Sequence, residues 1–450
     1  MEASELLRRR RIEPPFVVRK PIKLIRRFVE PTSFLSRISG ASNERTPQIY
    51  PPPRVARDRY WLHVFLFIVT VVSTAFTGAQ FIGRAAAWLQ SEVFFTLLGL
   101  PVSWPFICDG LTFSLALLGF LTVHEFGHYF AARYHRVKTS LPYYIPSPMI
   151  GIGTLGAVIR IREQIPSLKK LFDIGAAGPL AGFVVALGLL LYALATVPPP
   201  DYMFTVGGHE DLLLFIQQNG RFPDAMLPAP PDDATIRLVV GNTILYWGVA
   251  HLFPDVPPMY EMYHYPLLFA AWLGLFFTAL NLMPVGQLDG GHILYALVGP
   301  KWHARLARGF MMLMLISTAI SIVDEGPALL SAFPVLASSE LLAEAVVWLV
   351  LSTMLYVMLH RIFKGDLRLI VPALFGIVFI AAVARAVGPA LTQFGWFGWL
   401  LWCFLLIFLI RVDHPPVLYA EPLTRGRRVL GILSLLIFVL CFSIKPLYFV

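Results

Sequence analysis

The sequence predicts an all-α, polytopic membrane protein with about nine transmembrane helices (range about 8–10) and a small re-entrant β element. Of its 450 residues, 57% are hydrophobic and only 14% are charged, whereas soluble domains contain about 25% charged residues. So little polar surface cannot cover a water-soluble globule, and the same composition excludes a disordered or collagen-like protein. Long apolar segments also recur along the chain, and basic residues cluster at particular ends of them.

The net charge of +9 comes almost entirely from the N-terminus. Residues 1–60 contain 14 Lys and Arg against 6 Asp and Glu. We interpret residues 1–57 as a basic, proline-rich cytoplasmic tail that lies near lipid headgroups and does not bind nucleic acid. A solvated tail is the simpler interpretation, but four apolar residues could also form a short interfacial helix: Leu24, Ile25, Phe28 and Val29.

A membrane-crossing helix needs about 20 mainly apolar residues. The candidate segments are 61–83, 109–134, 171–197, 266–284, 308–323, 341–360, 368–387, 395–411 and 429–446. Basic residues place the N-terminus and the connection between the second and third segments in the cytoplasm. Residues 199–265 contain two basic and eight acidic residues, which predicts an extracytoplasmic loop.

Two further apolar stretches do not have the pattern of simple spans. Residues 86–107 contain Pro101 and Pro105, and residues 139–165 are rich in Gly, Pro and β-branched residues. Non-helical backbone survives at membrane depth only where protein or water satisfies its polar groups. We therefore expect both stretches to be protected loops or re-entrant elements that lie against the helices.

The second segment contains a candidate metal site. His124 and His128 are four residues apart, so they share one face of a helix and can reach one metal ion. Glu125 between them can take a proton from metal-bound water. A single histidine on an apolar helix is usually a satisfied core residue. Three ionisable groups within five residues of a membrane segment instead indicate a functional site.

Catalytic zinc usually has three protein ligands and one open position. The three cysteines (Cys108, Cys403 and Cys441) form no CxxC pair, which argues against a thiolate site. Acidic residues inside apolar segments are few: Glu92, Asp109, Asp173, Asp289 and Glu344. Asp289 is the best third ligand, because Pro284 and three nearby glycines would unwind the backbone around it. A cap at a helix end is the alternative role for Asp289.

These residues resemble those of the site-2 proteases, a family of intramembrane zinc metalloproteases. The run from Asn281 to Asp289 is similar to the family's Asn-Pro-Asp-Gly motif. Residues 141–146 and 153–160 resemble its re-entrant β element beside the active site, and residues 171–182 resemble its third span. The resemblance covers about residues 109–300. The longest loop, 199–265, leaves no room for a PDZ domain of ordinary size.

The resemblance implies one zinc ion, held by His124, His128 and Asp289, with Glu125 as the general base. Zinc lowers the pKa of bound water to about 7, so hydroxide is available at neutral pH. Asn281 either donates to the oxyanion or ties down the broken helix end. His292 either orients a ligand or lies at the membrane interface. His414, in a proline-rich connector, is more simply a loop residue.

The resemblance further implies a substrate that is a transmembrane helix of another protein. Once unwound, this helix could pair with an edge strand that contains Gly153, Thr154, Leu155 and Gly156. Residues 58–300 would form the protease core, and residues 301–450 would add helices of unknown role. We expect an integral protein of the bacterial plasma (inner) membrane, with the N-terminus and the active-site side in the cytoplasm. The sequence does not indicate an oligomeric state.

Two other functions fit parts of the pattern. A prenyl-protein endoprotease is also a membrane zinc peptidase, but a Glu from a later helix supplies its third ligand, and the Asp289 segment argues against this. A membrane metal-binding or transport protein without proteolytic activity also uses carboxylates and histidines within its spans. The preferred function is regulated intramembrane proteolysis by a zinc-dependent endopeptidase.

Overall fold

The computed structural model describes residues 59–148, 151–227, 237–330, 332–333 and 339–450. The chain divides into two compact units, Met1–Arg57 and Asp58–Val450. The expected basic tail, residues 1–57, lies outside the described residues. Everything below concerns the second unit.

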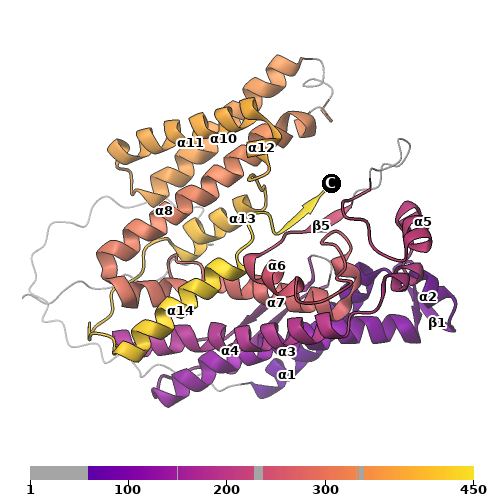
Figure 1. Cartoon of the computed structure of the whole chain (residues 1–450). Helices are drawn as coiled ribbons and strands as arrows, with labels where there is room; N and C mark the ends of the chain where they lie inside the picture. The colour runs from indigo at the N-terminus through magenta and orange to yellow at the C-terminus, as the bar shows by residue number, and fades with distance from the viewer. Residues whose placement is uncertain (1–58, 149–150, 228–236, 331, 334–338) are drawn as a thin grey trace, which may run out of the picture. The chain divides into compact units, whose positions relative to one another are not determined.

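Helices make up most of this unit (Figure 1). The longer helices are α1 (Tyr60–Ile82), α3 (Trp104–Tyr134), α4 (Leu168–Ala195), α7 (Pro266–Asn281), α8 (Asp289–Leu330), α10 (Glu340–Ile362), α11 (Leu367–Val387) and α14 (Arg425–Cys441). The shorter ones are α2 (Ala85–Leu89), η1 (Pro200–Thr205), α5 (Glu210–Asn219), α6 (Ile244–Ala250), η2 (Met262–His264), α12 (Pro389–Thr392), α13 (Trp399–Phe404) and the π-helical turn η3 (Leu405–Ile410). The strands are β1 (Val93–Leu97), β2 (Leu100–Ser103), β3 (Tyr143–Ser147), β4 (Gly153–Val158), β5 (Leu238–Val240) and β6 (Leu447–Phe449).

Within the described ranges, six helices are long and apolar enough to cross a membrane: α1, α3, α4, α8, α10 and α11. The expected count of about nine is therefore not confirmed. The segments expected at 266–284, 395–411 and 429–446 form the shorter helices α7, α13 with η3, and α14. With 16 residues, α7 is about 24 Å long, less than the hydrocarbon core of about 30 Å.

Helix α8 is longer than the segment predicted at 308–323, because it continues back to Asp289. It is kinked at Gly299, whose φ of 78° and ψ of 174° are not helical. Pro300 follows directly and cannot donate a helical hydrogen bond. Gly299 therefore separates two helical segments within α8.

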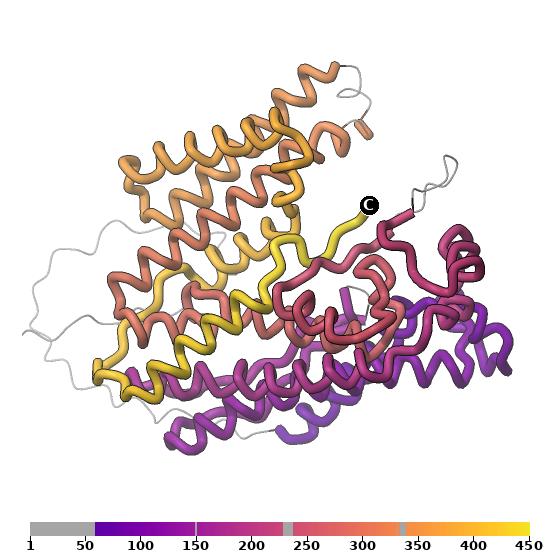
Figure 2. The backbone as a smooth tube through the Cα atoms, in the orientation of Figure 1, coloured from indigo at the N-terminus to yellow at the C-terminus, as the bar shows by residue number. Residues whose placement is uncertain are grey.

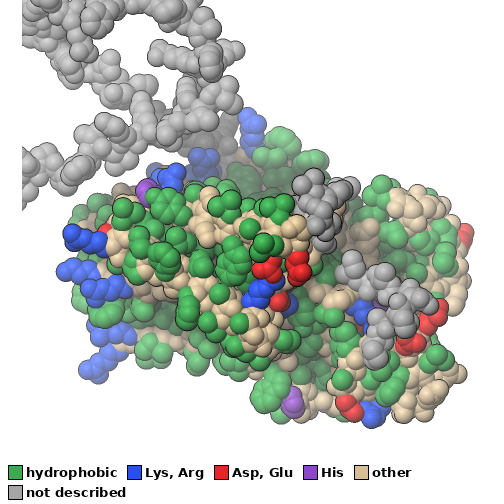
Figure 3. All heavy atoms as spheres, turned by 90° about the horizontal axis from the view of Figure 1, so that it is seen from above, with side chains coloured by type: hydrophobic (Ala, Val, Ile, Leu, Met, Phe, Trp, Pro, Cys, Tyr) green, Lys and Arg blue, Asp and Glu red, His purple; other side chains and the backbone are tan. Residues whose placement is uncertain are grey.

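The long helices pack in two groups, which Figures 1 and 2 show as lower and upper layers. In the lower layer, α3 contacts α1, α4 and α7. In the upper layer, α8 contacts α10, α11 and α13. Helix α8 also contacts α4, and α14 crosses between the layers to touch α4, α7 and α8. The surface of this unit is largely hydrophobic on the face shown in Figure 3, where Lys and Arg gather at the left end.

The β element expected within 139–165 is present as the antiparallel pair β3–β4. It packs against α1: the Ser73 hydroxyl donates to the Gly153 carbonyl (2.7 Å), and the His63 ring donates to the Pro142 carbonyl (2.9 Å). Gly153 has a φ of 85°, and a Cβ there would lie 2.6 Å from the Ser73 carbonyl oxygen. Glycine at this position therefore allows β4 to lie directly on α1.

Residues 86–107 were expected to form a protected loop or re-entrant element against the helices, but part of this stretch is an exposed hairpin. After α2, strands β1 and β2 form a hairpin around Leu98 and Gly99, both with positive φ (51° and 82°). All five residues of β1 are exposed. The run Val93–Leu97 has no alternation of polar and apolar residues, so its sequence does not distinguish a strand from a broken helix.

Candidate metal centre and active site

The structure brings together the three residues that the sequence predicted as metal ligands. His124 and His128 lie in α3, and Asp289 is the first residue of α8. The two Nε2 atoms are 3.1 Å apart, and Asp289 Oδ2 lies 3.2 Å from His128 Nε2 and 3.6 Å from His124 Nε2. Both histidines are buried, and 17% of the Asp289 side chain is exposed. Three ligand atoms therefore meet at one point inside the helix bundle.

The hydrogen bonding of His128 fits a metal ligand. Its Nδ1 donates to the Ile174 carbonyl at 2.7 Å, so Nε2 of the neutral ring presents a lone pair to the other two ligand atoms. A metal-bound histidine typically donates its second ring nitrogen in this way. Two imidazole nitrogens and one carboxylate oxygen are ligands that zinc accepts, and they leave a coordination position open.

Three glycines of α4 provide the space for these side chains. A Cβ at Gly178 would lie 2.1 Å from His128 Nε2, and one at Gly182 would lie 3.1 Å from His124 Nδ1. A Cβ at Gly175 would lie 2.9 Å from the Cβ of His292. These glycines lie within residues 171–182, which resemble the third span of the site-2 proteases, but the sequence predicted no role for them. Gly178 and Gly182 are four residues apart, as are His124 and His128. This matching spacing is the sequence feature that would have indicated the role of the glycines.

Glu125 and Asn281 also lie at this centre. The Glu125 side chain is 7% exposed, and the backbone of Ile159, directly after β4, is within hydrogen-bonding reach of its carboxylate. Asn281, the last residue of α7, has its amide nitrogen 3.5 Å from His124 Nε2. The end of β4 therefore lies beside Glu125, and the end of α7 lies beside His124.

The four residues predicted to bind substrate lie in β4 but have different surroundings. Gly153 and Thr154 are buried, and the Thr154 hydroxyl donates to the Ile145 carbonyl at 3.0 Å. Leu155 is 70% exposed. Gly156 has a φ of 101° and open space around the position of a Cβ. Leu155 is therefore the exposed one of these four residues.

The C-terminal part of the chain holds the segment that carries Asp289. The Gly286 backbone N–H donates to the Val412 carbonyl (3.1 Å), and the Gln287 side-chain amide donates to the Ile410 carbonyl (3.4 Å). His292 Nδ1 and His414 Nε2 are 2.7 Å apart. No sequence pattern indicated these contacts, because they join residues more than one hundred positions apart.

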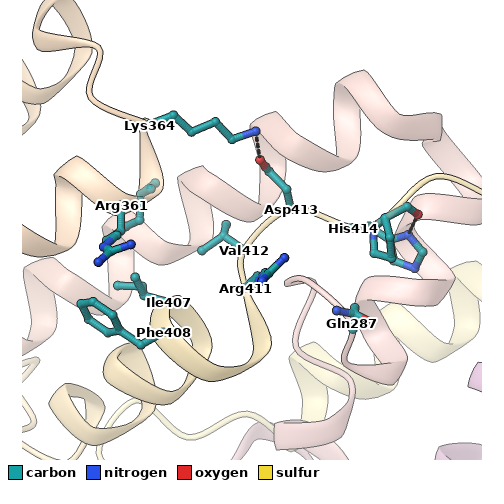
Figure 4. Close-up of a pocket in the computed structure, with 11 residues that line it drawn as sticks. Gln287, Arg361, Lys364, Ile407, Phe408, Arg411, Val412, Asp413 and His414 are labelled. Carbon is teal, nitrogen blue, oxygen red and sulfur yellow. Dashed lines mark hydrogen bonds and ion pairs between the residues drawn. The ribbon is translucent and has the colours of Figure 1, made fainter. Parts of the chain in front are cut away.

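A cavity of about 620 Å³ opens beside the same connection (Figure 4). Its polar lining includes Gln287, Arg361, Lys364, Arg411, Asp413 and His414. Figure 4 shows Lys364 reaching Asp413, with 2.6 Å between Nζ and Oδ2. Burial lowers the pKa of the His414 imidazole, although its bond to the Pro415 carbonyl opposes this. The cavity lies beside Gln287, two residues before Asp289, and none of the three candidate metal ligands lines it.

Comparison with known proteins agrees with this centre. Residues 112–323 match the model of peptidase family M50. A probable zinc metalloprotease EGY1, chloroplastic, of Oryza sativa subsp. japonica is 30% identical over 251 residues, which are 54% of this chain and 38% of the relative. A probable zinc metalloprotease EGY2, chloroplastic, of Arabidopsis thaliana is 30% identical over 213 residues (47% of this chain, 33% of the relative). No solved structure matches the chain.

These comparisons also limit two conclusions. The chain spans well under half the length of either curated relative. Both relatives are named as chloroplastic, so the expectation of a bacterial inner membrane receives no support. The coarser expectation of an integral membrane protein agrees with the six helices long enough to span. The matched residues 112–323 contain His124, His128 and Asp289, and the match to a peptidase M50 domain confirms the resemblance to the site-2 proteases.

Proposed function

We propose that the protein is a zinc-dependent intramembrane endopeptidase that cuts a peptide bond within or near a transmembrane helix of another membrane protein. The convergence of His124, His128 and Asp289 carries this proposal, because it places a zinc-type ligand set inside helices apolar enough to cross a membrane. Ionisable groups at such positions are costly unless they serve a function. The family match supports the same activity.

We assign the metal to His124, His128 and Asp289. A zinc ion bound there would supply Lewis acidity and lower the pKa of water. The Glu125 carboxylate accepts a proton from the attacking water and passes it to the nitrogen of the leaving amine. The Asn281 amide donates to the oxygen that becomes negatively charged during attack, and its distance of 3.5 Å from His124 Nε2 supports this assignment.

The substrate must unwind before cleavage, because a helical peptide bond is shielded by its own hydrogen bonds. We place the unwound segment along β4, at Gly153, Thr154, Leu155 and Gly156, as an added strand. The exposure of Leu155 and the closeness of Ile159 to Glu125 support this placement. A strand paired there would run toward the general base.

We assign residues 58–300 to the catalytic core and place the metal centre on the cytoplasmic side. The basic residues at the left end of Figure 3 support this orientation, since positive charges favour the cytoplasmic side of a membrane. Residues 301–450 support the core through the contacts at Gly286 and His292.

Substitution of Glu125 by Gln tests the activity. The variant should keep one zinc ion at the centre, because no ligand is changed, and should lose cleavage of a model transmembrane substrate by at least a thousandfold. Zinc content and substrate cleavage are measured on the same reconstituted protein. Glu340→Gln, which makes the same chemical change at an exposed position at the start of α10, should leave both unchanged.

Cleavage by Glu125→Gln at the wild-type rate would contradict the proposed mechanism. A wild-type protein that binds zinc but does not cut any transmembrane substrate would instead favour a metal-binding or transport protein.

A further inference from the structure

We propose that the protein holds a second divalent metal ion, of the zinc class, at His209, Glu261 and His264. The Glu261 carboxylate lies between the two imidazole rings, with Oε1 3.4 Å from His209 Nδ1 and Oε2 3.5 Å from His264 Nε2. The three residues offer ligand atoms within 4.8 Å of one another. The sequence led us to expect a single zinc ion, and none of these residues was predicted as a ligand.

Two polar atoms of this cluster are buried without a hydrogen bond. Glu261 is 2% exposed and His264 is 4% exposed. In the part of the chain that the structure describes, neither Glu261 Oε2 nor His264 Nε2 has a hydrogen-bond partner. Burying an unpaired carboxylate is expensive, and buried charges are usually paired or coordinate a metal. A cation bound between these groups would offset the cost of burying them.

The orientation of His264 suits a metal ligand. His264 Nδ1 donates to the Ile82 carbonyl at 2.7 Å, so the neutral ring directs the lone pair of Nε2 at Glu261. A lone pair and a carboxylate oxygen repel each other at 3.5 Å, but both become ligands when a metal ion lies between them. Ile82 then orients His264 as Ile174 orients His128.

The backbone holds His209 in place at some cost. Its φ of 63° is left-handed, a conformation uncommon for residues other than glycine. Gly207, two residues before it, donates from its backbone N–H to the Gly83 carbonyl at 3.1 Å. The loop before α5 is therefore fixed on the end of α1, and His209 turns back toward Glu261. Strain of this kind persists where the surroundings enforce it, often at ligand sites.

The proposed site is separate from the M50 centre. Its ligand His264 contacts Ile82 at the C-terminal end of α1, near the Arg84–Asp109 ion pair. Asp109 and His124 lie in the same helix, α3, and their separation in sequence corresponds to about 22 Å along its axis. One ion cannot serve both clusters.

The ligand chemistry indicates the class of metal. Two imidazoles suit zinc and neighbouring transition metals, whereas calcium and magnesium prefer sites made of oxygen ligands. Three protein ligands leave a position for water. The burial of Glu261 and His264 excludes a bulky substrate. The ion would fasten η2 to the start of α5, and both segments are hydrogen-bonded to the end of α1.

Zinc content of the purified full chain tests the proposal. We expect about two zinc ions per chain in the wild type and about one in His124→Ala/His128→Ala, where the second site is untouched. Glu261→Gln/His264→Ala should also retain about one. His251→Ala, which removes an exposed histidine of the same extramembrane region, should retain two and is the matched control.

The outcomes separate this site from the proposed protease function. A single zinc ion in the wild type that disappears in His124→Ala/His128→Ala would overturn the second site and leave the protease proposal intact. Two ions in Glu261→Gln/His264→Ala would also overturn it. Cobalt substituted for zinc in His124→Ala/His128→Ala gives an independent measurement: visible absorption typical of nitrogen and oxygen ligands supports the site, and no bound cobalt contradicts it.

Discussion

Two glycines of α4 fix how closely its backbone approaches the metal ligands. Gly178 faces His128 and Gly182 faces His124. His128 cannot move away freely, because its other ring nitrogen is bonded to Ile174. A methyl group at Gly178 would therefore push the ring out of line with Asp289.

We predict that Gly178→Ala lowers zinc affinity roughly 10- to 100-fold, the range found when groups that orient a ligand are changed. Cleavage should fall with it. Competition for zinc with a chelator measures the affinity. Gly188→Ala is the matched control, because a Cβ there meets nothing within 4 Å, and alanine is the better helix former. Equal zinc affinity in the two variants would show that α4 does not position His128.

At this scale the sequence predicted which candidate ligands lie together, but not the groups that orient them. His124, His128 and Asp289 were recognisable because ionisable residues stand out in apolar segments. The Ile174 carbonyl is a backbone group with no signature of its own. The partner of His292 could not be foreseen either, since the contact with His414 depends on how the C-terminal loop returns.

At the scale of single elements, the proposed substrate pairing of β4 can be tested at Leu155. Pairing with a substrate strand and packing of the side chain depend on different atoms of this residue. A substrate strand would use backbone N–H and C=O groups, whereas packing would use the Leu155 side chain. Leu155→Pro removes the N–H, and Leu155→Ala removes most of the side chain but keeps the N–H.

We predict that Leu155→Pro loses at least nine-tenths of cleavage while zinc content stays at the wild-type value. Leu155→Ala should retain most of its activity. Both are measured with the model transmembrane substrate used for Glu125→Gln. Full cleavage by the proline variant would rule out strand pairing at this position, and equal losses in both variants would assign the effect to the side chain.

The elements themselves were predictable where a long apolar run had clear ends. The segments expected at 109–134 and 171–197 correspond to α3 and α4, although each helix begins earlier in the chain. Helix α7 ends at Asn281, before the expected 284, because Pro284 and the following turn interrupt it. The hairpin β1–β2 was missed, since its exposed apolar residues carry no strand alternation.

At the scale of the whole molecule, the C-terminal third packs against the helices that carry the candidate metal ligands. Arg427 donates two hydrogen bonds of 2.7 Å to the Asp173 carboxylate in α4. Leu168, at the start of α4, donates from its backbone N–H to the Tyr419 carbonyl (3.0 Å). Strand β6, near the C-terminus, pairs with β5, which lies between α5 and α6 in the chain. The sequence could not reveal this role, because residues 301–450 carry none of the ligand residues.

Asp413 connects these parts of the molecule. Its carboxylate lies 3.1 Å from Arg308 in α8 and 2.6 Å from Lys364 in the turn after α10. Val412, the preceding residue, accepts the hydrogen bond from Gly286. Burial alone would raise the pKa of Asp413, but the hydrogen bond from Lys364 and the charges of Arg308 and Lys364 outweigh it and lower the pKa.

A lowered pKa in the folded state means that Asp413 stabilises the protein above its unfolded pKa of about 3.9, and that this stabilisation is lost as the pH falls through the folded value. We predict that Asp413→Asn lowers the thermal unfolding temperature by a few degrees at pH 7, and that the difference from wild type shrinks below about pH 4. Asp224→Asn removes a carboxylate that is 89% exposed and pairs with Arg221, so it should change little at either pH. Thermal unfolding in detergent measures all three proteins. The difference in unfolding temperature between Asp413→Asn and wild type could instead stay constant down to pH 3. The charge of Asp413 would then not hold together α8, the turn after α10 and the segment that contains Gly286.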